Sequence, residues 1–299
     1  MKILVTGASG LIGSAFCKVR EQSGDQIIRA SRKEPKDANS VRWDPDSGFD
    51  DNALPLIEGA DVFVHLAGES VSGLRWGEEK KQAIRDSRVH GTRSVIDAIA
   101  KLNQRPKVFL SASAIGFYGD RGDEELTEAS PPGDTFLADV CRQWETESRR
   151  AEDLGVRTVL LRNGIVLSKD GGALASMLLP FRLGLGGVIG NGKQWMSWVS
   201  LDDVVSIMEF VIETESIRGA VNVVSPNPVT NEEFTKTLGE VLYRPTILPI
   251  PEFAVHLVFG EMGDALLLDS TRVIPKRLSD AGYEFRYPHL KEALVHALK

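Results

Sequence analysis

Short apolar runs alternate with longer amphipathic stretches over the first half of the chain. Residues 2–6, 26–30, 61–66, 108–111 and 156–161 form strand-length apolar runs. After the first run, apolar residues recur at helical spacing: Leu11, Ile12, Ala15, Phe16 and Val19. Parallel strands need crossover helices and are covered on both faces. The pattern therefore predicts an α/β fold with a Rossmann-type, doubly wound parallel sheet.

The pattern changes after residue 165. A Gly-rich irregular stretch follows, and then a strand-like run at 220–225. The next segment is predicted to be a helix that begins at a capping box formed by Thr230 and Glu233. The tail carries several prolines and an apolar, helix-like stretch at 253–268. We expect a smaller C-terminal cap domain folded over the carboxyl edge of the sheet. The Rossmann domain would comprise residues 1–165 and about 197–227, and the cap about 166–196 and 228–299.

Composition excludes several classes of protein. The 299 residues are 42% hydrophobic and carry a formal net charge of -7, which gives no field that attracts nucleic acid. No apolar run reaches the ~18 residues of a membrane span, and the chain opens on a strand-like run rather than a signal peptide. Cys17 and Cys141 lie in separate helical stretches, which suggests neither a disulfide nor a metal site. We expect a cytoplasmic protein that acts on an unknown small molecule, with no metal and no nucleic-acid or membrane partner.

The first apolar run ends in a glycine-rich loop, VTGASGLIG, that leads into a helix. Glycines three residues apart allow a tight turn, a close approach of the backbone to a pyrophosphate and close packing of helix on sheet. The helix N-terminus also offers free N–H groups to phosphate. A glycine-rich turn without a ligand is the alternative, but the order of strand, loop and amphipathic helix favours dinucleotide binding. The expected contacts are Gly7, Ser9, Gly10, Leu11, Ile12 and Gly13.

The residues after the second strand indicate which dinucleotide is bound. A carboxylate at this point holds a ribose 2′-hydroxyl, whereas a cation accommodates a 2′-phosphate. The chain has Ser31 and Arg32 there, and a planar guanidinium suits a phosphate. The sequence therefore predicts NADP(H) rather than NAD(H), unless Arg32 is only a solvated surface charge.

Several motifs resemble those of a known superfamily. TGASGLIG (6–13) and HLAG (65–68) resemble the extended short-chain dehydrogenases/reductases, which include the NAD-dependent epimerases and dehydratases of nucleotide sugars. Further segments are similar to an atypical "epimerase family" branch with a C-terminal domain of unknown function: SRVHGT (87–92), SASAIGFYG (111–119), LRNGIVL (161–167), GNGKQWMSWVSLDD (190–203) and NVVSPNPVTNEEF (222–234). The resemblance implies further cofactor contacts: Leu66, Ala67, Gly68, Glu69, Arg88, Ser111, Ala112 and Ile165. It also makes a homodimer a reasonable expectation, because relatives often pair through helices.

The acid/base pair of the superfamily is missing. Its members carry Tyr-x-x-x-Lys on a helix, where the lysine lowers the pKa of the tyrosine. The matching helix reads TFLADVCRQWE (135–145), with Phe136 at the tyrosine position and Val140 at the lysine position. Phe136, Val140 and Trp144 recur every four residues and form an apolar face that can pack against the sheet. Phenylalanine cannot exchange a proton, so an acid/base step must use another group.

By resemblance, other residues correspond to the family's substrate-orienting and cofactor-binding positions. Ser113 corresponds to the hydroxyl that orients the substrate oxygen, and Tyr118 either presents a phenol to the substrate or anchors its loop. Arg88 stands where the superfamily has asparagine and could replace the missing lysine as a ligand of ribose or phosphate, although it cannot act as a base. Trp198, with Trp195, either forms a wall of the substrate site or fills the cleft between the domains. His65 ends a buried strand and is expected to be a core residue rather than a base.

Two functions fit these features. The first is an oxidoreductase or nucleotide-sugar-epimerase-like enzyme that transfers hydride between the nicotinamide and a carbinol or carbonyl carbon, with Ser113 and Tyr118 as catalytic candidates. The second is a non-catalytic sensor or regulatory protein in which NADP(H) stabilises the fold or an interface. The missing tyrosine and lysine favour the second function, whereas the glycine loop is common to both.

Overall fold

An eight-stranded, mostly parallel sheet forms the centre of the protein. The computed structural model describes residues 1–35, 37–50, 52–73 and 75–299. The strand order is β12-β8-β6-β5-β1-β2-β3-β4, and within this sheet only the β3–β4 pair is antiparallel. The bounds are β1 (Lys2–Thr6), β2 (Gln26–Ser31), β3 (Ser40–Asp44), β4 (Gly48–Phe49), β5 (Val62–His65), β6 (Val108–Ala114), β8 (Arg157–Asn163) and β12 (Gly219–Val223). The Rossmann-type sheet expected from the sequence is confirmed.

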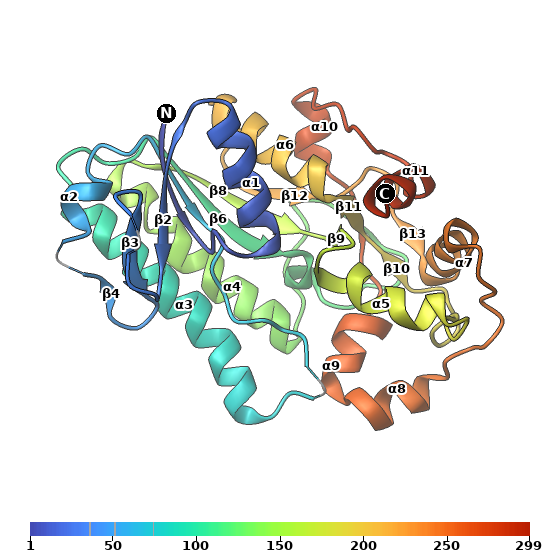
Figure 1. Cartoon of the computed structure of the whole chain (residues 1–299). Coiled ribbons are helices and arrows are strands. Elements are labelled where there is room, and N and C mark those ends of the chain that lie inside the picture. The colour runs from blue at the N-terminus through green and yellow to red at the C-terminus, as the bar shows by residue number, and fades with distance from the viewer. Residues whose placement is uncertain (36, 51, 74) are drawn as a thin grey trace.

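Helices cover both faces of this sheet (Figure 1). One face carries α1 (Leu11–Gln22) and α6 (Leu201–Glu213), and the other carries α3 (Glu78–Lys101) and α4 (Phe136–Arg149). The short helix α2 (Leu54–Ile57) precedes β5. The protein therefore has the three layers of a doubly wound fold.

The two cores follow from the alternation of side chains along each strand. Ile3 and Val5 of β1 point into the core under α1 and α6, whereas Leu4 points into the core under α3. Phe63 of β5 joins Leu4, and Val64 joins the opposite core. Strands that are apolar on both faces are buried on both faces, as the continuous apolar runs predict.

The chain reverses its direction of winding at β1. β2 pairs with one side of β1 and β5 pairs with the other, while α1 and α3, which follow β1 and β5, lie on opposite faces. Ligands of open parallel sheets bind at the carboxyl ends of strands at such a reversal. The glycine loop follows β1 and the HLAG segment follows β5, so both motifs lie at this crevice.

The smaller C-terminal part is mostly helical. Its helices are α5 (Gly172–Arg182), α7 (Asn231–Leu242), α8 (Glu252–Phe259), α9 (Glu261–Gly263), α10 (Lys276–Asp280) and α11 (Leu290–Ala297). Short strands pair as β9 (Ile165–Leu167) with β11 (Trp198–Ser200), β10 (Trp195–Met196) with β13 (Val229–Thr230), and β14 (Arg272–Val273) with β7 (Glu125–Leu126). The helical turn η3 (Asp264–Leu268) also lies in this part, whereas η1 (Ile115–Tyr118) follows β6 and η2 (Glu152–Leu154) precedes β8.

Packing within this part is centred on one core. Leu178 of α5, Leu238 of α7 and Leu294 of α11 belong to it. Leu278 of α10 is different, because it joins the core over the main sheet, where Tyr283 also packs. The C-terminal segment therefore contacts both the cap and the sheet domain.

Two cations connect the segment after β5 and the start of α3 to α8 and α9. Arg75 donates hydrogen bonds to the carbonyl oxygens of Leu257 and Val258 at the end of α8. Lys81, at the start of α3, forms an ion pair with Glu261 at 2.5 Å. The segment after β5 is thereby fixed to α8 and α9.

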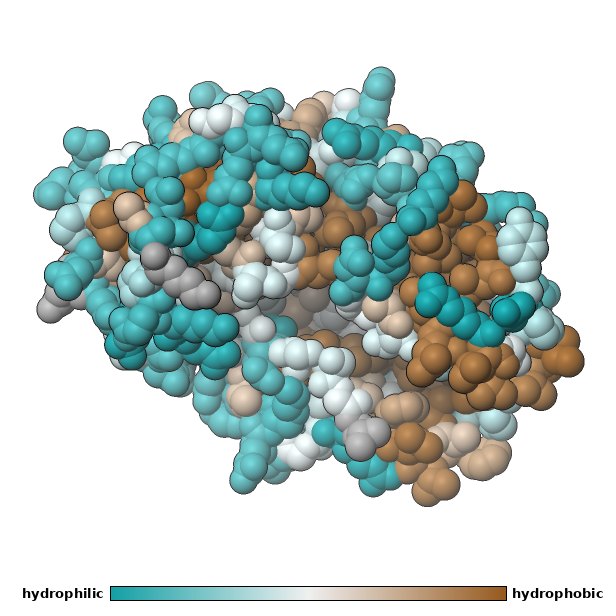
Figure 2. Space-filling view, in the orientation of Figure 1, coloured by the Kyte–Doolittle hydropathy of each residue, from teal (hydrophilic) through white to brown (hydrophobic). Residues whose placement is uncertain are grey.

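The surface is uneven in polarity. Figure 2 shows a hollow between the sheet domain and the cap, and apolar surface gathered over α5 and α8 on the cap side. Among the described residues, no helix combines the length and the apolar character needed to cross a membrane.

Candidate functional site

The glycine loop closes tightly between β1 and α1. Gly7 has φ +70°, and a Cβ there would lie 2.8 Å from the backbone nitrogen of Ala67. A Cβ at Gly13 would lie 2.2 Å from the carbonyl oxygen of Gly7. Both contacts are too short for any side chain, so the loop and the helix can approach this closely only with glycine.

The N-terminus of α1 is open toward the crevice. The helix begins after Gly10 without a side-chain cap from any described residue, and its first turn holds no acidic residue. Ser9 and Gly10 are exposed at this end, while Leu11 and Ile12 are half-buried. The first N–H groups of α1 are therefore available to a phosphate, and the helix dipole favours a negative charge there.

The end of β2 lies beside this loop. β1 and β2 pair in parallel up to Thr6 and Ala30, so Ser31 and Arg32 follow at the same edge. Both are exposed, and Arg32 forms no ion pair or hydrogen bond within the described part of the chain. The structure thus places a free guanidinium next to the glycine loop.

The end of β5 contributes a buried histidine. Nδ1 of His65 lies 2.7 Å from Oγ1 of Thr6, and its ring lies edge-on to Trp43 at 5.8 Å and stacked on Phe109 at 6.4 Å. Burial lowers the pKa of His65 to about 3, so the ring is neutral at pH 7. Nε2 has no hydrogen-bond partner among the residues described. His65 is a core residue, as its position in the sequence indicated.

Leu66, Ala67, Gly68 and Glu69 then lead away from β5 at the carboxyl edge. The Glu69 carboxylate accepts a hydrogen bond from Lys80 at 2.6 Å, which lowers its pKa, and the charges of Lys80, Arg32 and Arg88 add to this effect. The ends of β2 and β5 flank the end of β1 at the same edge of the sheet, which places Arg32 and Glu69 on either side of the glycine loop. Glu69 is already paired, so it is less free than its place in the sequence suggested.

Arg88 lies against the end of β5. Its NH1 donates to the carbonyl oxygens of Glu69 and Ile84, both at 3.0 Å. Its Cζ lies 5.1 Å from the centre of the Trp144 ring, and a Cβ on Gly68 would lie only 3.4 Å from it. Burial lowers the pKa of the Arg88 guanidinium, yet arginine stays protonated in proteins. A half-buried cation that lacks a carboxylate partner within the described residues favours binding of an anion nearby.

The start of α4 carries Phe136 and Val140 at the two positions that the resemblance assigns to the acid/base pair. Val140 and Trp144 are buried under the helix, at 1% and 4% exposure. Phe136 is half-buried and packs edge-on against the ring of Trp76 at 5.5 Å, with two cations over its ring: Lys81 at 5.3 Å and Arg85 at 5.7 Å. The apolar packing predicted for Val140 and Trp144 is confirmed, whereas Phe136 packs on the loop after β5 and on α3.

Ser113 and Tyr118 are joined by a buried polar network. The Ser113 hydroxyl donates to Oε1 of Glu145 at 2.8 Å. Glu145 also accepts from Nε of Arg162 at 2.7 Å and from NH2 at 2.8 Å. NH1 of Arg162 donates to the Tyr118 hydroxyl at 2.9 Å, and Tyr118 donates to Oδ1 of Asn222 at 2.6 Å. All of these side chains are buried.

This network bears on the two alternatives left open for Tyr118. Its side chain is fully buried, and burial raises the pKa of the phenol although Arg162 opposes the shift. Of the two alternatives, Tyr118 anchors its loop, because the hydroxyl is committed to Arg162 and Asn222. No described residue donates a hydrogen bond to the Ser113 hydroxyl oxygen, and the hydroxyl itself donates to Glu145.

Glu145, Arg162 and Asn222 were not anticipated from the sequence. The available signal was Arg162, a charged residue at the end of the apolar run that forms β8. A buried arginine needs a carboxylate partner. The sequence does not say which of many carboxylates supplies it.

The remaining predicted contacts lie along neighbouring strands. Ser111 is buried and accepts a hydrogen bond from Ser148 at 2.8 Å, while Ala112 at the end of β6 and Ile165 at the start of β9 are half-buried. Trp198 is fully buried, and its indole N–H donates to the carbonyl oxygen of Asn227 at 3.1 Å. Trp198 therefore belongs to the core of the C-terminal part and does not present a wall to a substrate.

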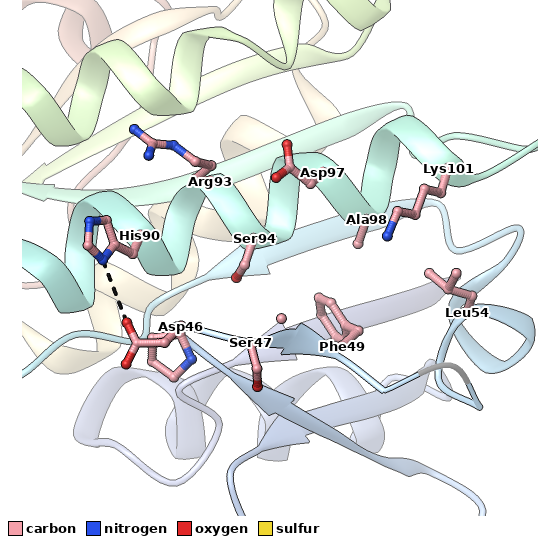
Figure 3. A pocket seen from close by; sticks show the side chains of 12 residues that line it. Asp46, Ser47, Phe49, Leu54, His90, Arg93, Ser94, Asp97, Ala98 and Lys101 are labelled. Atoms are coloured by element: carbon pink, nitrogen blue, oxygen red, sulfur yellow. Dashed lines mark ion pairs between the residues drawn. The ribbon is translucent and has the colours of Figure 1, made fainter.

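Two cavities lie outside the crevice. One of about 350 Å³ separates the β3–β4 turn from the second half of α3 (Figure 3), where Nδ1 of His90 lies 3.6 Å from Oδ1 of Asp46. The other, of about 380 Å³, is lined by Trp195 and Arg272, whose Cζ lies 4.6 Å from the centre of the Trp195 ring. Neither cavity is lined by a residue predicted to bind the cofactor, and of the two tryptophans considered for a wall of the substrate site only Trp195 lines one of them, the second cavity.

Comparison with known proteins identifies relatives over the whole chain. Residues 3–223 match the NAD dependent epimerase/dehydratase family, and residues 250–297 match a domain of unknown function, DUF1731. An epimerase family protein of Mycobacterium bovis is 40% identical over 296 residues, which cover 99% of this chain and 97% of that protein. The human epimerase family protein SDR39U1 is 35% identical over 297 residues, which cover 98% of each chain.

Two solved structures are similar in fold and in sequence. The crystal structure of human SDR39U1 (isoform 2) with NADPH has a TM-score of 0.90 and 34% identity, and the match covers 99% of this chain and 98% of that one. The nucleoside-diphosphate sugar epimerase of Corynebacterium glutamicum has a TM-score of 0.82 and 37% identity, over 100% of this chain and 58% of that one. The glycine loop, the doubly wound sheet and these relatives agree, and the chain belongs to the NAD-dependent epimerase/dehydratase family, in its branch of epimerase family proteins with a C-terminal DUF1731 domain.

Proposed function

We propose that the protein binds NADP(H) in the crevice between the carboxyl ends of β1 and β5. The observation that carries this proposal is the open N-terminus of α1 beside two cations without carboxylate partners among the described residues, Arg32 and Arg88. An open helix N-terminus suits the pyrophosphate, and a second cation suits the additional phosphate that distinguishes NADP from NAD. The human relative crystallised with NADPH supports the same cofactor.

Each group of residues has a part in holding the cofactor. The backbone of Gly7 and the start of α1, from Ser9 to Gly13, would bind the pyrophosphate. Ser31 and Arg32 would bind the 2′-phosphate. Arg88 would neutralise charge near the nicotinamide half, while the edges of β5, β6 and β9 would line the dinucleotide through Leu66, Ala67, Gly68, Glu69, Ser111, Ala112 and Ile165.

A binding titration tests the cofactor assignment. Arg32→Ala should weaken NADPH binding roughly 10- to 100-fold, because a hydrogen-bonded charge contributes about 1.5–3 kcal/mol, and NADH binding should barely change. Arg105→Ala is the matched control, because Arg105 is exposed and donates to Leu154 at the opposite edge of the sheet. Equal affinities for NADPH and NADH in the unaltered protein would overturn the NADP(H) assignment.

For the reaction, we propose oxidoreductase or epimerase-like chemistry on a small molecule. The bound cofactor would supply or accept a hydride, and the chain would position the substrate oxygen. Ser113 fits this task best: its proton is directed to Glu145, which leaves an oxygen lone pair to accept a hydrogen bond from a substrate hydroxyl. Ser113→Ala should then lower kcat more than it raises KM, because the interaction serves the reacting oxygen.

A second candidate function has its own observation. Phe136 and Val140 stand where proton-transfer groups would be, and the Tyr118 hydroxyl is sealed in the core. A protein that binds NADP(H) without turning it over would act as a sensor or a regulator. Following NADPH absorbance with a panel of aldehydes, ketones and sugars distinguishes the two functions, since tight binding without substrate-dependent oxidation favours the sensor.

A further inference from the structure

The first half of α3 presents three cations on one face. Lys81, Arg85 and Arg88 follow one another at spacings of four and three residues, which places their side chains next to each other along the helix. Arg88 lies against the end of β5, where a Cβ on Gly68 would be 3.4 Å from its Cζ, and Lys81 pairs with Glu261 of α9. The three side chains therefore form a row from the carboxyl end of β5 to the cap, which we call the cation row.

Arg85, in the middle of the cation row, makes little use of its hydrogen-bond donors. It donates no hydrogen bond to any residue that the structure describes, and its Nε is buried without an acceptor among them. Its NH2 lies 3.6 Å from Oδ2 of Asp139, beyond hydrogen-bond distance, and this carboxylate accepts hydrogen bonds from Arg142 and Gln143 instead. A guanidinium has five N–H donors, so Arg85 can bind a further acceptor without losing an existing hydrogen bond.

The ring of Phe136 fixes the position of this guanidinium. Cζ of Arg85 lies 5.7 Å and Nζ of Lys81 lies 5.3 Å from the centre of the ring, and Trp76 packs edge-on against the same ring at 5.5 Å. An aromatic face attracts a cation but leaves the N–H groups at the edge of a guanidinium available. At the position that corresponds to the tyrosine of the superfamily, this chain thus holds two cations in place.

We propose that Arg85 binds a carboxylate of the substrate, with Lys81 and Arg88 on either side of it, and that this substrate is a small oxo acid or hydroxy acid. The inference rests on the proposed function, because it places the substrate beside the cofactor at the end of β5. A planar guanidinium fits a carboxylate through two parallel hydrogen bonds. The side chain of Arg85 is 35% exposed, so a ligand can reach its outer N–H groups.

A carboxylate fits the charges around the cation row better than a phosphate does. Lys81 already has Glu261 as a partner at 2.5 Å, and Asp139 lies 3.6 Å from Arg85. A phosphate monoester carries about −1.5 to −2 charges at pH 7, and both carboxylates would repel it. A carboxylate brings a single negative charge and two oxygens in the plane that the guanidinium edge requires.

Calorimetric titration of the full chain loaded with NADP⁺ tests the inference. The probes are 2-oxobutanoate, acetoacetate and levulinate, which set the carboxylate at increasing distance from the ketone, and their methyl esters are the neutral controls. At least one acid should bind at least about tenfold more tightly than its ester, and Arg85→Gln should weaken its binding about 10- to 100-fold. Arg142→Gln is the matched control, because Arg142 is exposed and pairs with the same Asp139, and it should leave acid binding nearly unchanged.

NADPH titrations of the same proteins separate this inference from the cofactor proposal. Arg85→Gln should bind NADPH as the unaltered protein does, which also shows that the variant folds; a loss as large as that of the acid would assign Arg85 to the cofactor and overturn the inference. The inference is also wrong if no acid binds more tightly than its ester, if Arg142→Gln weakens acid binding as much as Arg85→Gln does, or if dihydroxyacetone phosphate binds more tightly than every acid. Absence of NADPH binding by the unaltered protein would overturn the cofactor proposal together with the inference.

Discussion

Removing Glu145 should destabilise the protein far more than removing a carboxylate from its surface. Glu145→Ala leaves the guanidinium of Arg162, which is 3% exposed, without its carboxylate, and leaves the Ser113 hydroxyl without its acceptor. Breaking a buried ion pair by removing one partner costs about 3–5 kcal/mol, because the remaining charge stays buried.

The surroundings of Arg162 place the expected loss in the upper part of this range. Two charged hydrogen bonds, at 2.7 and 2.8 Å, are lost together. Cζ of Arg162 lies 3.5 Å from the centre of the Phe117 ring, which covers one face of the guanidinium and leaves little room for water to replace the carboxylate. Tm falls by roughly 2–4 °C for each kcal/mol in proteins of about 150–250 residues and by less in longer chains, so Tm should fall by up to about 15 °C.

Thermal and urea unfolding measure this loss against a close control. Glu147→Ala lies two residues further along α4 and breaks pairs with Arg93 at 2.7 Å and Arg150 at 2.9 Å, both of which are exposed. Surface pairs contribute about 0–1 kcal/mol each, so Glu147→Ala should shift Tm only slightly. The double variant Glu145→Leu with Arg162→Met should recover most of the stability, because it removes both charges. If Glu145→Ala costs no more than Glu147→Ala, the reasoning about the buried pair is wrong.

Three further results are expected. In a titration, Arg88→Met should weaken NADPH binding at least about tenfold. Binding of 2′,5′-ADP, which lacks the nicotinamide half, should stay nearly unchanged. Equal losses for both ligands would contradict the assignment of Arg88 to the nicotinamide half. Val140→Lys should lower the free energy of unfolding by several kcal/mol, because an ammonium would enter a site that is 1% exposed. Phe136→Tyr, at a half-buried site, should lower it by less than about 1 kcal/mol. Urea denaturation compares the two variants. The pKa of His65 is about 3 in the folded protein and about 6.5 in the unfolded chain, so between these values only the unfolded chain binds the proton. The free energy of unfolding therefore falls as pH drops from about 6.5 toward 3, by up to about 1.4 kcal/mol per pH unit. Burial and neighbouring carboxylates raise the pKa of Asp269 to about 6, so its contribution to the free energy of unfolding falls as pH rises from about 4 to 6. Urea denaturation of His65→Gln and Asp269→Asn across this range should separate the two contributions.

The sheet and the glycine loop could be predicted from the sequence because local signals specify them. Apolar runs of strand length mark β1, β2, β5, β6 and β8, and each is buried on both faces. The loop needs glycine for steric reasons that act within a few residues, as the 2.2 Å approach of a Cβ at Gly13 shows. In contrast, β3 (Ser40–Asp44) was not anticipated, because it has only two apolar residues, Val41 and Trp43, and lies near the edge of the sheet.

The catalytic candidates were harder to place because their environment is assembled from distant residues. Tyr118 meets Arg162 and Asn222, which lie 44 and 104 residues further along the chain. No local pattern links these positions, so the sequence left open whether Tyr118 faces a substrate or the core. Trp198 posed the same problem, since its burial depends on the packing of the cap helices.

The position of β12 has a consequence for synthesis of the chain. β12 pairs with β8 at the end of the main sheet, but it is encoded after α5, which belongs to the cap. A nascent chain released as far as residue 165 would therefore expose the edge of β8, and an open strand edge invites pairing with other chains. The sheet can be completed only after the first cap segment has left the ribosome. The two parts consequently cannot mature one after the other, and truncation at the apparent domain boundary should yield an aggregating fragment rather than a smaller dinucleotide-binding protein.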